Sequence, residues 1–390
     1  MSSIRSPEER LAEGRESGGV IGSGPCYRRR KPPGSALPMC CRIASDALRG
    51  GGRLGLGAVT HAVVVLADGL GRRAPRRTAG TRAPWHPVWT RIPRSPPGSP
   101  PRPPALATLT TGRPPGRTGW WAIAPWTRRA ASWSPSSRST GSIPRSGSAS
   151  STLFESAEDV RSIAIASPRH RVSALTRAVL RGAEYVGAAS TADRFREARR
   201  MLAEPGPALI YLYVAELDVE GHARGVGSPR WLAALEELDA QTGGLVREMG
   251  ERQGMLVTAD HGMTRVPPEG QRIVLPELLA GVRQVAGEPR CLHLHLEPGI
   301  EADAVAASWR EAEGPRAWVA TRDEAIGAGW FGETDPAVRP RIGDVLVAAR
   351  TGFAYYVDAD DTGRRMVGQH GSFGPEEQEI PLLRFGAFAA

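Results

Sequence analysis

Four short apolar runs, each leading into a polar loop, most constrain what this chain can fold into. They lie at residues 61–68 (HAVVVLAD), 163–166 (IAIA), 208–218 (ALIYLYVAELD) and 255–260 (MLVTAD). A continuous apolar run of this length is typical of a strand that is buried on both faces of a parallel sheet. Between the runs, residues 190–202 and 231–250 carry apolar side chains at helical spacing, with charged residues elsewhere. This alternation predicts an α/β fold in which a mainly parallel sheet has helices on both faces.

The rest of the chain has a different texture. The whole chain of 390 residues can bury a sizeable core, and one elaborated domain with an insertion fits the pattern. Residues 1–57 are rich in Gly, Arg and Pro and follow no regular period, which predicts a disordered or misread arm. Ten of the thirty residues from 75 to 104 are proline, a density that packed helices and strands do not tolerate. We therefore expect the folded domain over residues 58–390.

The formal charge of +9 is confined to one stretch of the chain. Residues 69–154 contain fourteen Arg and no Asp, Glu or Lys, so the remaining 36 of the 50 basic residues stand against all 41 acidic residues. The enzyme-like part is therefore mildly acidic, and most of the basic stretch lacks the interleaved aromatic residues of a nucleic-acid binder. Nucleic acid is not the expected partner.

The cysteines and the apolar runs indicate the compartment. The four cysteines (Cys26, Cys40, Cys41 and Cys291) form no CxxC pair and no regular pattern, so we expect neither a disulfide framework nor a cysteine-based zinc site. No apolar run approaches the roughly 20 residues that a membrane span needs. The prediction is a cytoplasmic protein without a membrane partner.

Carboxylates and histidines lie mostly at the ends of the predicted strands. They are Asp68, then Asp218 and His222 in LDVEGH, Asp260 and His261 in TADHGM, and His370 in GQHGS. Taken singly, each group also fits a helix cap, a strand-end turn or a surface histidine. Together, in loops that meet at one edge of a parallel sheet, they predict a metal site.

Mixed Asp and His ligands without thiolates suit zinc, with manganese as the second choice. Two such ions, ~3.5–4 Å apart in known sites, orient the attacking and leaving oxygens of a displacement at phosphorus. The predicted reaction class is phosphate ester hydrolysis.

The motifs ADGLG, ALATLTTGRPPGRTG, LDVEGH, TADHGM and GQHG, in this order, resemble the nucleotide pyrophosphatase / type I phosphodiesterase family of the alkaline phosphatase superfamily. The resemblance covers residues 58–390. It implies a three-layer alkaline-phosphatase-like catalytic domain with a small inserted cap at about residues 266–362, and a small nucleotide-like phosphorylated substrate. It also implies two zinc ions, one held by Asp68, Asp260 and His261, the other by Asp218, His222 and His370.

The same resemblance exposes a gap at the nucleophile. The family places a catalytic threonine nine residues before the threonine of its Thr-Gly pair, here Thr111, and that position holds Arg102. Arginine cannot attack phosphorus. Thr108, Thr110 and Thr111 are expected too far along the following helix to face the metals, and Thr118 stands where the family has a histidine.

A shift of reading frame would explain this gap. Lys31 is the only lysine while arginine abounds, which indicates a gene rich in G and C. Read one base out of frame, the codons of residues 100–104 can encode Ser-Thr-Thr-Ala-Thr, and those of 122–129 can encode Gly-Tyr-Arg-Pro-Val-Asp-Pro-Ala. Our hypothesis is that compensating frame errors alter residues 72–104, 122–151 and the arm around 25–53, which the nucleotide sequence would decide.

Three other interpretations remain open. One is a phosphomonoesterase or mutase of the same superfamily. Another is an inactive metal-binding domain whose basic arm binds nucleic acid or acidic lipid. The third is a metal site at Cys291, His293 and His295 (CLHLHL), although this alternation is what a half-buried edge strand of the cap would show.

Overall fold

The computed structural model describes residues 40–50, 56–72, 105–119 and 151–389. Arg102 lies outside these residues. So does nearly all of residues 72–104 and 122–151, the two inner segments of the frame-shift hypothesis. None of the helices in the described ranges combines the length and the apolar composition that crossing a bilayer requires.

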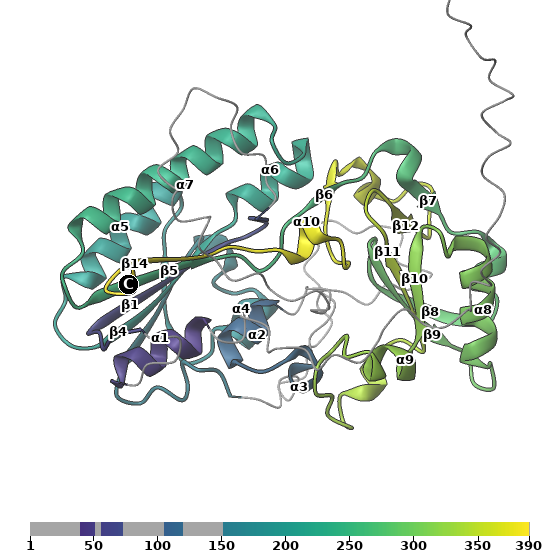
Figure 1. Cartoon of the computed structure of the whole chain (residues 1–390), viewed down its shortest axis with the longest axis horizontal. Coiled ribbons are helices and arrows are strands. Elements are labelled where there is room, and N and C mark those ends of the chain that lie inside the picture. Colours follow the sequence, from purple (N-terminus) through teal and green to yellow (C-terminus); the bar gives the residue numbers. More distant parts are fainter. Residues whose placement is uncertain (1–39, 51–55, 73–104, 120–150, 390) are drawn as a thin grey trace, which may run out of the picture. The chain divides into compact units, whose positions relative to one another are not determined.

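The largest sheet of the described fold has six strands, with helices packed against it (Figure 1). Its strand order is β14-β5-β1-β4-β2-β3. All neighbours are parallel except β14, which runs antiparallel to β5 at one edge. The strands are β1 (His61–Ala67), β2 (Arg161–Ala166), β3 (Glu184–Gly187), β4 (Ala208–Val214), β5 (Gln253–Thr258) and β14 (Leu382–Gly386).

The apolar runs of the sequence become the interior of this sheet. Every residue of β1 is buried, because β1 pairs with β4 on one side and β5 on the other while helices cover both faces. The register sets His61 beside Ala208 and Gln253, so the three strands run in step toward the same edge. The predicted mainly parallel α/β fold is confirmed.

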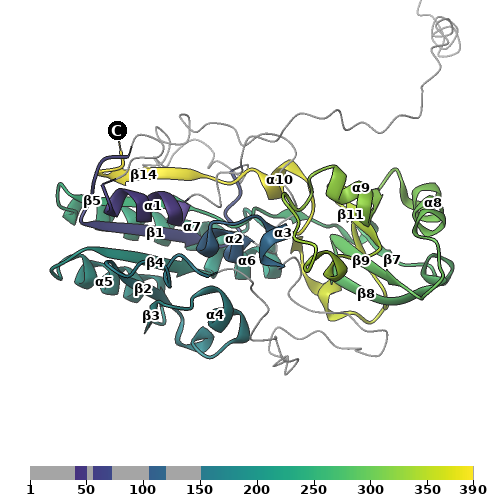
Figure 2. The ribbon, with the colours of Figure 1, turned by 90° about the horizontal axis from the view of Figure 1, so that it is seen from below.

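Helices pack on both faces of the sheet, as Figure 2 shows from below. One face carries α5 and α7, and the other carries α1 and α2. The helices of this part are α1 (Cys40–Leu48), α2 (Ala105–Thr111), α3 (Pro115–Thr118), α4 (Ala174–Val179), α5 (Thr191–Leu202), α6 (Glu216–Arg224) and α7 (Pro229–Glu248).

Helix α1 departs from the expectation of an unstructured arm over residues 1–57. Cys41, Ala44 and Ala47 are fully buried in the same core as β1. These residues recur three positions apart, which places them on one face of a helix, and their small side chains let the helix lie close to the strand. The surrounding Gly- and Arg-rich composition hid this short periodic segment.

A second, antiparallel sheet has the strand order β10-β11-β9-β8. Its strands are β8 (Val282–Glu288), β9 (Cys291–Leu296), β10 (Ala317–Thr321) and β11 (Val345–Ala349), with α8 (Ala302–Glu313) and α9 (Arg322–Gly327) packed against them. Strand β9 lies between β11 and β8, so the expectation of an edge strand at residues 291–296 was wrong. Alternation along one strand does not reveal how many neighbours it has.

Two small ladders and several single turns complete the described fold. Strands β6 (Thr264–Arg265) and β13 (Gly368–Gln369) pair antiparallel, and β7 (Gln271–Ile273) pairs parallel with β12 (Ala354–Tyr356). The turns are α10 (Pro375–Gln378) and the 3-10 helices η4 (Pro168–His170), η5 (Pro268–Gly270), η6 (Pro276–Leu279), η7 (Arg339–Arg341) and η8 (Thr362–Arg365).

Candidate metal centre

The carboxyl ends of three neighbouring strands place most of the predicted ligands. Asp68 directly follows β1, and Asp260 and His261 follow β5 after one intervening residue. Helix α6, which begins two residues after β4, carries the remaining pair from this edge. Because β5, β1 and β4 are adjacent and parallel, these side chains converge, as the fold class requires.

Asp218 and His222 lie on α6, one turn apart. The run predicted as a strand to residue 218 therefore ends at Val214, and the helical turn that the ligand spacing needs is present. His222 Nε2 lies 3.3 Å from Asp218 Oδ1. The two side chains project to the same side of the helix, where they can share one cation.

The β6–β13 ladder brings the last ligand to the others. Gln369 pairs with Thr264, which sets the following His370 beside the loop that contains His261. The rings of His261 and His370 stack with centroids 3.6 Å apart and an angle of 17° between their planes. His370 Nε2 lies 3.9 Å from Asp218 Oδ1, and its ring centroid lies 5.0 Å from that of His222.

Within the described residues, two groups of side chains could each hold an ion. Asp68, Asp260 and His261 form one, with ligand atoms all within 4.8 Å of one another, and Asp218, His261 and His370 form the other. His261 Nε2 lies 3.3 Å from Asp68 Oδ1 and 3.8 Å from Asp260 Oδ2. The structure thus brings all six sequence-predicted residues together, with His222 joined through Asp218.

The contacts of the histidine rings define which nitrogen faces the carboxylates. His222 Nδ1 lies 2.8 Å from the carbonyl oxygen of Gly368, and His261 Nδ1 lies 3.0 Å from that of Gly262. A carbonyl can only accept, so each Nδ1 carries a proton and each Nε2 is the nitrogen that faces the site. Metal-binding histidines are held in this way.

The acids and bases of the site perturb one another. Burial, with the neighbouring Asp260 and Asp218, raises the pKa of Asp68 well above its ordinary value. Burial and Asp218 also raise the pKa of Asp260 to about 6. Burial opposes the ionisation of Asp218, but His222 and His370 outweigh it and hold the pKa of Asp218 well below its usual range.

The histidines respond in opposite directions. Burial would lower the pKa of His222, but the Asp218 carboxylate raises it to about 9. Burial and His261 lower the pKa of His370 well below its ordinary value. With the protein's groups alone, protons must therefore compensate the crowded carboxylates, and divalent cations would displace those protons on binding.

The residues fit two divalent cations. The buried atoms Asp68 Oδ1, Asp218 Oδ1 and His370 Nδ1 have no hydrogen-bond partner in the described parts of the chain. Buried oxygens of ionisable carboxylates left in this way are costly unless a cation lies against them. The donor set of three carboxylates and three imidazoles provides three protein ligands for each ion.

Glycines allow the loops of the site to approach one another. Gly69 has a φ of +75°, and a Cβ atom on it would lie 3.0 Å from the Cα atom of Asp218. A Cβ atom on Gly262 would lie 2.0 Å from the carbonyl oxygen of Glu376. Any larger residue at either position would push these loops, and the ligands on them, apart.

Sequence reasoning missed two groups that contact the ligands. The Tyr213 hydroxyl donates a hydrogen bond to Asp68 Oδ2, and Glu288 Oε2 lies 3.5 Å from His370 Nδ1. Tyr213 could have been noticed as the tyrosine nearer the ligands of the two in an otherwise apolar strand. Glu288 comes from the antiparallel sheet, and its contact with the site cannot be inferred from spacing.

Two of the three threonines near the expected nucleophile make hydrogen bonds within their own helix. The Thr110 hydroxyl donates to the Leu106 carbonyl at 3.0 Å and the Thr111 hydroxyl to the Ala107 carbonyl at 2.6 Å, both within α2. Thr108 is buried and its hydroxyl has no hydrogen-bond partner in the ranges described. Arg102, at the nucleophile position, is not among the described residues.

The alternative site on β9 is a packed strand. His293 is buried, its Nδ1 accepts a hydrogen bond of 3.3 Å from the Gly343 amide, and its ring packs against Phe331. Burial, with His295 and Arg322, lowers the pKa of His293 to about 3. The side chains of Cys291, His293 and His295 do not form one of the two candidate groups found in the described residues.

Comparison with solved structures defines the fold class. Murine ectonucleotide pyrophosphatase / phosphodiesterase 5, as an inactive variant in complex with AMP, superposes with a TM-score of 0.62 at 19% identity, covering 84% of this chain and 88% of that one. The human protein superposes with a TM-score of 0.62 at 17% identity, covering 83% of this chain and 87% of that one. Phosphonoacetate hydrolase from Sinorhizobium meliloti 1021, in complex with phosphonoacetate, gives 0.59 and 15%, covering 84% and 91%. The chain shares the alkaline-phosphatase-like fold of these proteins.

The family follows from the sequence itself. Residues 96–373 match the type I phosphodiesterase / nucleotide pyrophosphatase family, and the chain belongs to it. The match contains Asp218, His222, Asp260, His261 and His370 but begins after Asp68. No curated protein sequence matches the chain significantly.

Proposed function

We propose that this chain is a two-metal hydrolase of phosphodiester or pyrophosphate bonds in nucleotide-like substrates, impaired by the absence of a nucleophilic threonine. One observation carries the proposal: in a member of the phosphodiesterase family, six Asp and His side chains from helix α6 and three loops converge at the carboxyl edge of the sheet. Two divalent ions are proposed, zinc first and manganese second. The cytoplasmic location expected from the cysteines is part of the same proposal.

The proposed division of labour follows from the contacts. Asp68, Asp260 and His261 would hold one ion, and Asp218, His222 and His370 the other. When bound, the ions would orient a phosphate group and stabilise the charge that develops on its oxygens. Tyr213 fixes the carboxylate of Asp68 by its hydrogen bond, and the Gly368 and Gly262 carbonyls fix the rings of His222 and His261.

A nucleotide-like substrate is supported by the relatives. The murine phosphodiesterase 5 was solved with AMP, and the bacterial hydrolase with phosphonoacetate. Both ligands are small and carry a phosphoryl or phosphonyl group. The murine variant is inactive with one threonine replaced by alanine, which supports the role that we assign to the missing threonine.

Restoring the nucleophile tests the proposal. The repaired chain replaces residues 100–104 with Ser-Thr-Thr-Ala-Thr, which includes Arg102→Thr, and residues 122–151 with their shifted reading. We expect metal-dependent hydrolysis of bis(4-nitrophenyl) phosphate and of a nucleotide phosphodiester to rise by several orders of magnitude. Removing a nucleophile leaves on the order of 10³–10⁴ acceleration over water in well-studied hydrolases, well below the intact enzyme.

A matched control isolates the threonine. The same repaired chain with Arg102→Ala in place of Arg102→Thr should fold alike, bind the same two ions and stay inactive. Parallel assays with 4-nitrophenyl phosphate and phosphonoacetate separate a diesterase from a monoesterase and a phosphonate hydrolase. A repaired chain that folds, holds two metals and hydrolyses none of these above the original protein would disprove the proposal.

A further inference from the structure

The three histidines of the metal centre are not held alike. His222 and His261 each direct Nδ1 at a backbone carbonyl, whereas His370 Nδ1 lies 3.5 Å from the Glu288 carboxylate. His370 Nε2, on the other side of the ring, is the nitrogen that faces Asp218. Glu288 therefore contacts the ring at the nitrogen that points away from the ion site, so it is placed to orient the ring rather than to bind the same ion.

Glu288 reaches this position from the antiparallel sheet. It is the last residue of β8, at the tight connection between β8 and β9. A Cβ atom on Gly371, which has a φ of +120°, would lie 2.8 Å from Glu288 Oε2. The glycine that follows His370 thus lets the carboxylate approach the ligand loop closely.

A buried ion pair fixes the same connection to the ligand loop. Arg290 donates to Glu377 from Nε at 2.7 Å and from Nη2 at 2.6 Å, and the two side chains are 0% and 1% exposed. The Ser372 amide, two residues after His370, also donates a hydrogen bond of 2.9 Å to Glu377 Oε1. A two-pronged pair of this kind defines both distance and angle, so residues 288–290 cannot slide along the loop.

The backbone of Glu377 is also bonded to the turn that carries His261, the histidine stacked on His370. The Gly262 amide donates to the Glu377 carbonyl oxygen at 2.8 Å, directly after His261. Arg290 further donates to the carbonyls of Arg350 at 3.0 Å and Ala349 at 3.2 Å. One arginine–glutamate pair thus connects the antiparallel sheet, the His261 turn and the His370 loop.

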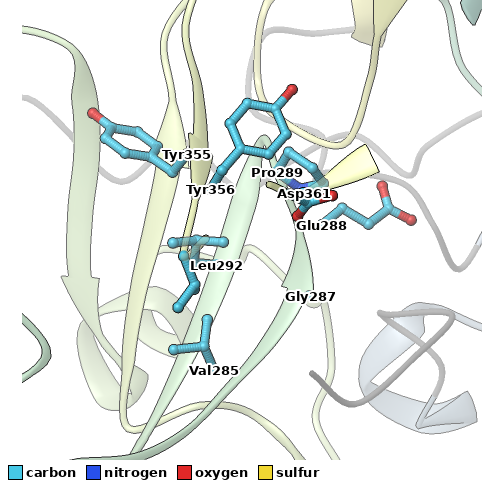
Figure 3. Close-up of a pocket in the computed structure, with 9 residues that line it drawn as sticks. Val285, Gly287, Glu288, Pro289, Leu292, Tyr355, Tyr356 and Asp361 are labelled. Carbon is cyan, nitrogen blue, oxygen red and sulfur yellow. The ribbon is translucent and has the colours of Figure 1, made fainter. Parts of the chain in front are cut away.

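Glu288 lies in surroundings that exclude most water, since its side chain is 16% exposed and that of His370 13%. It lines a small pocket whose other walls include Val285, Leu292, Tyr355 and Tyr356, and Figure 3 shows its side chain extending beyond Pro289, away from the apolar floor. A carboxylate that contacts an imidazole in such poorly hydrated surroundings is screened little by water.

From these contacts we propose that Glu288 is a positioning residue for the ion held by Asp218, His222 and His370, and that the Arg290–Glu377 pair keeps it in place. Glu288 fixes the ring of His370 so that Nε2 points into the site. Glu288 itself then acts on the ion held through His370 and not on the ion held by Asp68, Asp260 and His261. This inference rests on the proposed metal centre.

The experiment measures zinc binding by the full chain. Wild type, Glu288→Ala and Glu288→Gln are titrated with Zn2+ against a chromophoric chelator, and zinc content is determined after dialysis. We expect Glu288→Ala to bind one of two ions about 10- to 100-fold more weakly, the usual effect of removing such a partner. Glu288→Gln keeps a polar oxygen that can face Nδ1, so its loss should be smaller. The matched control is Glu297→Gln, an exposed glutamate of the same sheet region.

Separate outcomes test the inference and the function on which it rests. Loss at one site only, with the second affinity and the melting temperature close to those of Glu297→Gln, supports the positioning role. A folded wild type that binds no zinc would overturn the proposed metal centre itself. If wild type binds two ions and both Glu288 variants bind them as tightly as Glu297→Gln, the inference fails while the proposed function stands.

Discussion

Two clusters of histidines in this molecule have opposite surroundings. At the carboxyl edge of the parallel sheet, His222, His261 and His370 lie beside carboxylates. On β9 of the antiparallel sheet, His293 lies among apolar groups and accepts a hydrogen bond from the Gly343 amide, and His295 precedes the end of the strand. Both clusters suggest metal binding in the sequence, yet only the first combines imidazoles with unpartnered carboxylate oxygens.

The difference shows what makes a histidine cluster a cation site. The Asp218 carboxylate, acting against burial, raises the pKa of His222 to about 9, whereas burial, His295 and Arg322 lower that of His293 to about 3. The surroundings of His222 favour positive charge, and those of His293 exclude it. Spacing along a strand or helix brings imidazoles together, but the neighbouring acids decide whether a cation is stable there.

Metal content is the largest effect expected to separate the clusters. His370→Ala should lose mainly one of two bound zinc or manganese ions, because it removes one of three proposed ligands of that ion. His295→Ala, the control in the antiparallel sheet, should retain both. Elemental analysis of dialysed protein gives the count directly. A folded wild type without metal, or a His370→Ala protein that retains both ions, would contradict the assignment of the metal centre.

The sequence predicted well which of these residues lie together, because their positions depend on local rules. A buried parallel strand ends in a loop at a defined edge, so Asp68, Asp260 and His261 could be placed together without coordinates. The helical spacing of Asp218 and His222 is equally local. These rules extend to His370 only through the family resemblance, because its place is set by the β6–β13 ladder, which joins residues distant in the chain.

The groups that sequence reasoning missed depend on distant contacts. Glu288 meets His370 because an antiparallel hairpin lies against the ligand loop, and Arg290 pairs with Glu377 across the same contact. No periodicity encodes such a contact. The interior position of β9 was missed for a similar reason, since its partners β8 and β11 lie before and well after it in the chain. Helix α1 was missed because its apolar face consists of small residues.

Acid stability should reveal the excluded charge on β9. His293 has its pKa lowered to about 3 in the folded protein, whereas the unfolded chain binds a proton near the ordinary 6.5. The stability from keeping the ring neutral is therefore full above pH 6.5 and is lost as the pH falls toward 3. The loss follows a slope of about 1.4 kcal/mol per pH unit, or about 2 kcal/mol at pH 5.

The matching variant is His293→Gln, which cannot titrate. Urea unfolding at pH 7.5, 6 and 5 should give a shallower fall in unfolding free energy than for wild type, by that same slope. Protonation at Nδ1 would also place a proton against the Gly343 amide, which reinforces the direction of the effect. Equal slopes for variant and wild type would show that His293 is protonated in the folded state and that the contrast between the clusters is wrong.

The smallest expected effect is a loss of stability at two helix caps, which tests whether the two sheets unfold together. Among the described residues, a complete capping box begins a helix in each region: Ser190 and Asp193 in α5, and Thr321 and Glu324 in α9. Removing either hydroxyl leaves a helix amide without its acceptor, so Ser190→Ala and Thr321→Ala should each cost about 1 kcal/mol. Because the buried Arg290–Glu377 pair joins the regions, we expect one unfolding transition whose midpoint falls by a similar amount in both variants. Calorimetry that shows a separate transition, shifted by Thr321→Ala alone, would mean that the antiparallel sheet opens independently and that Glu288 is held only while it is closed.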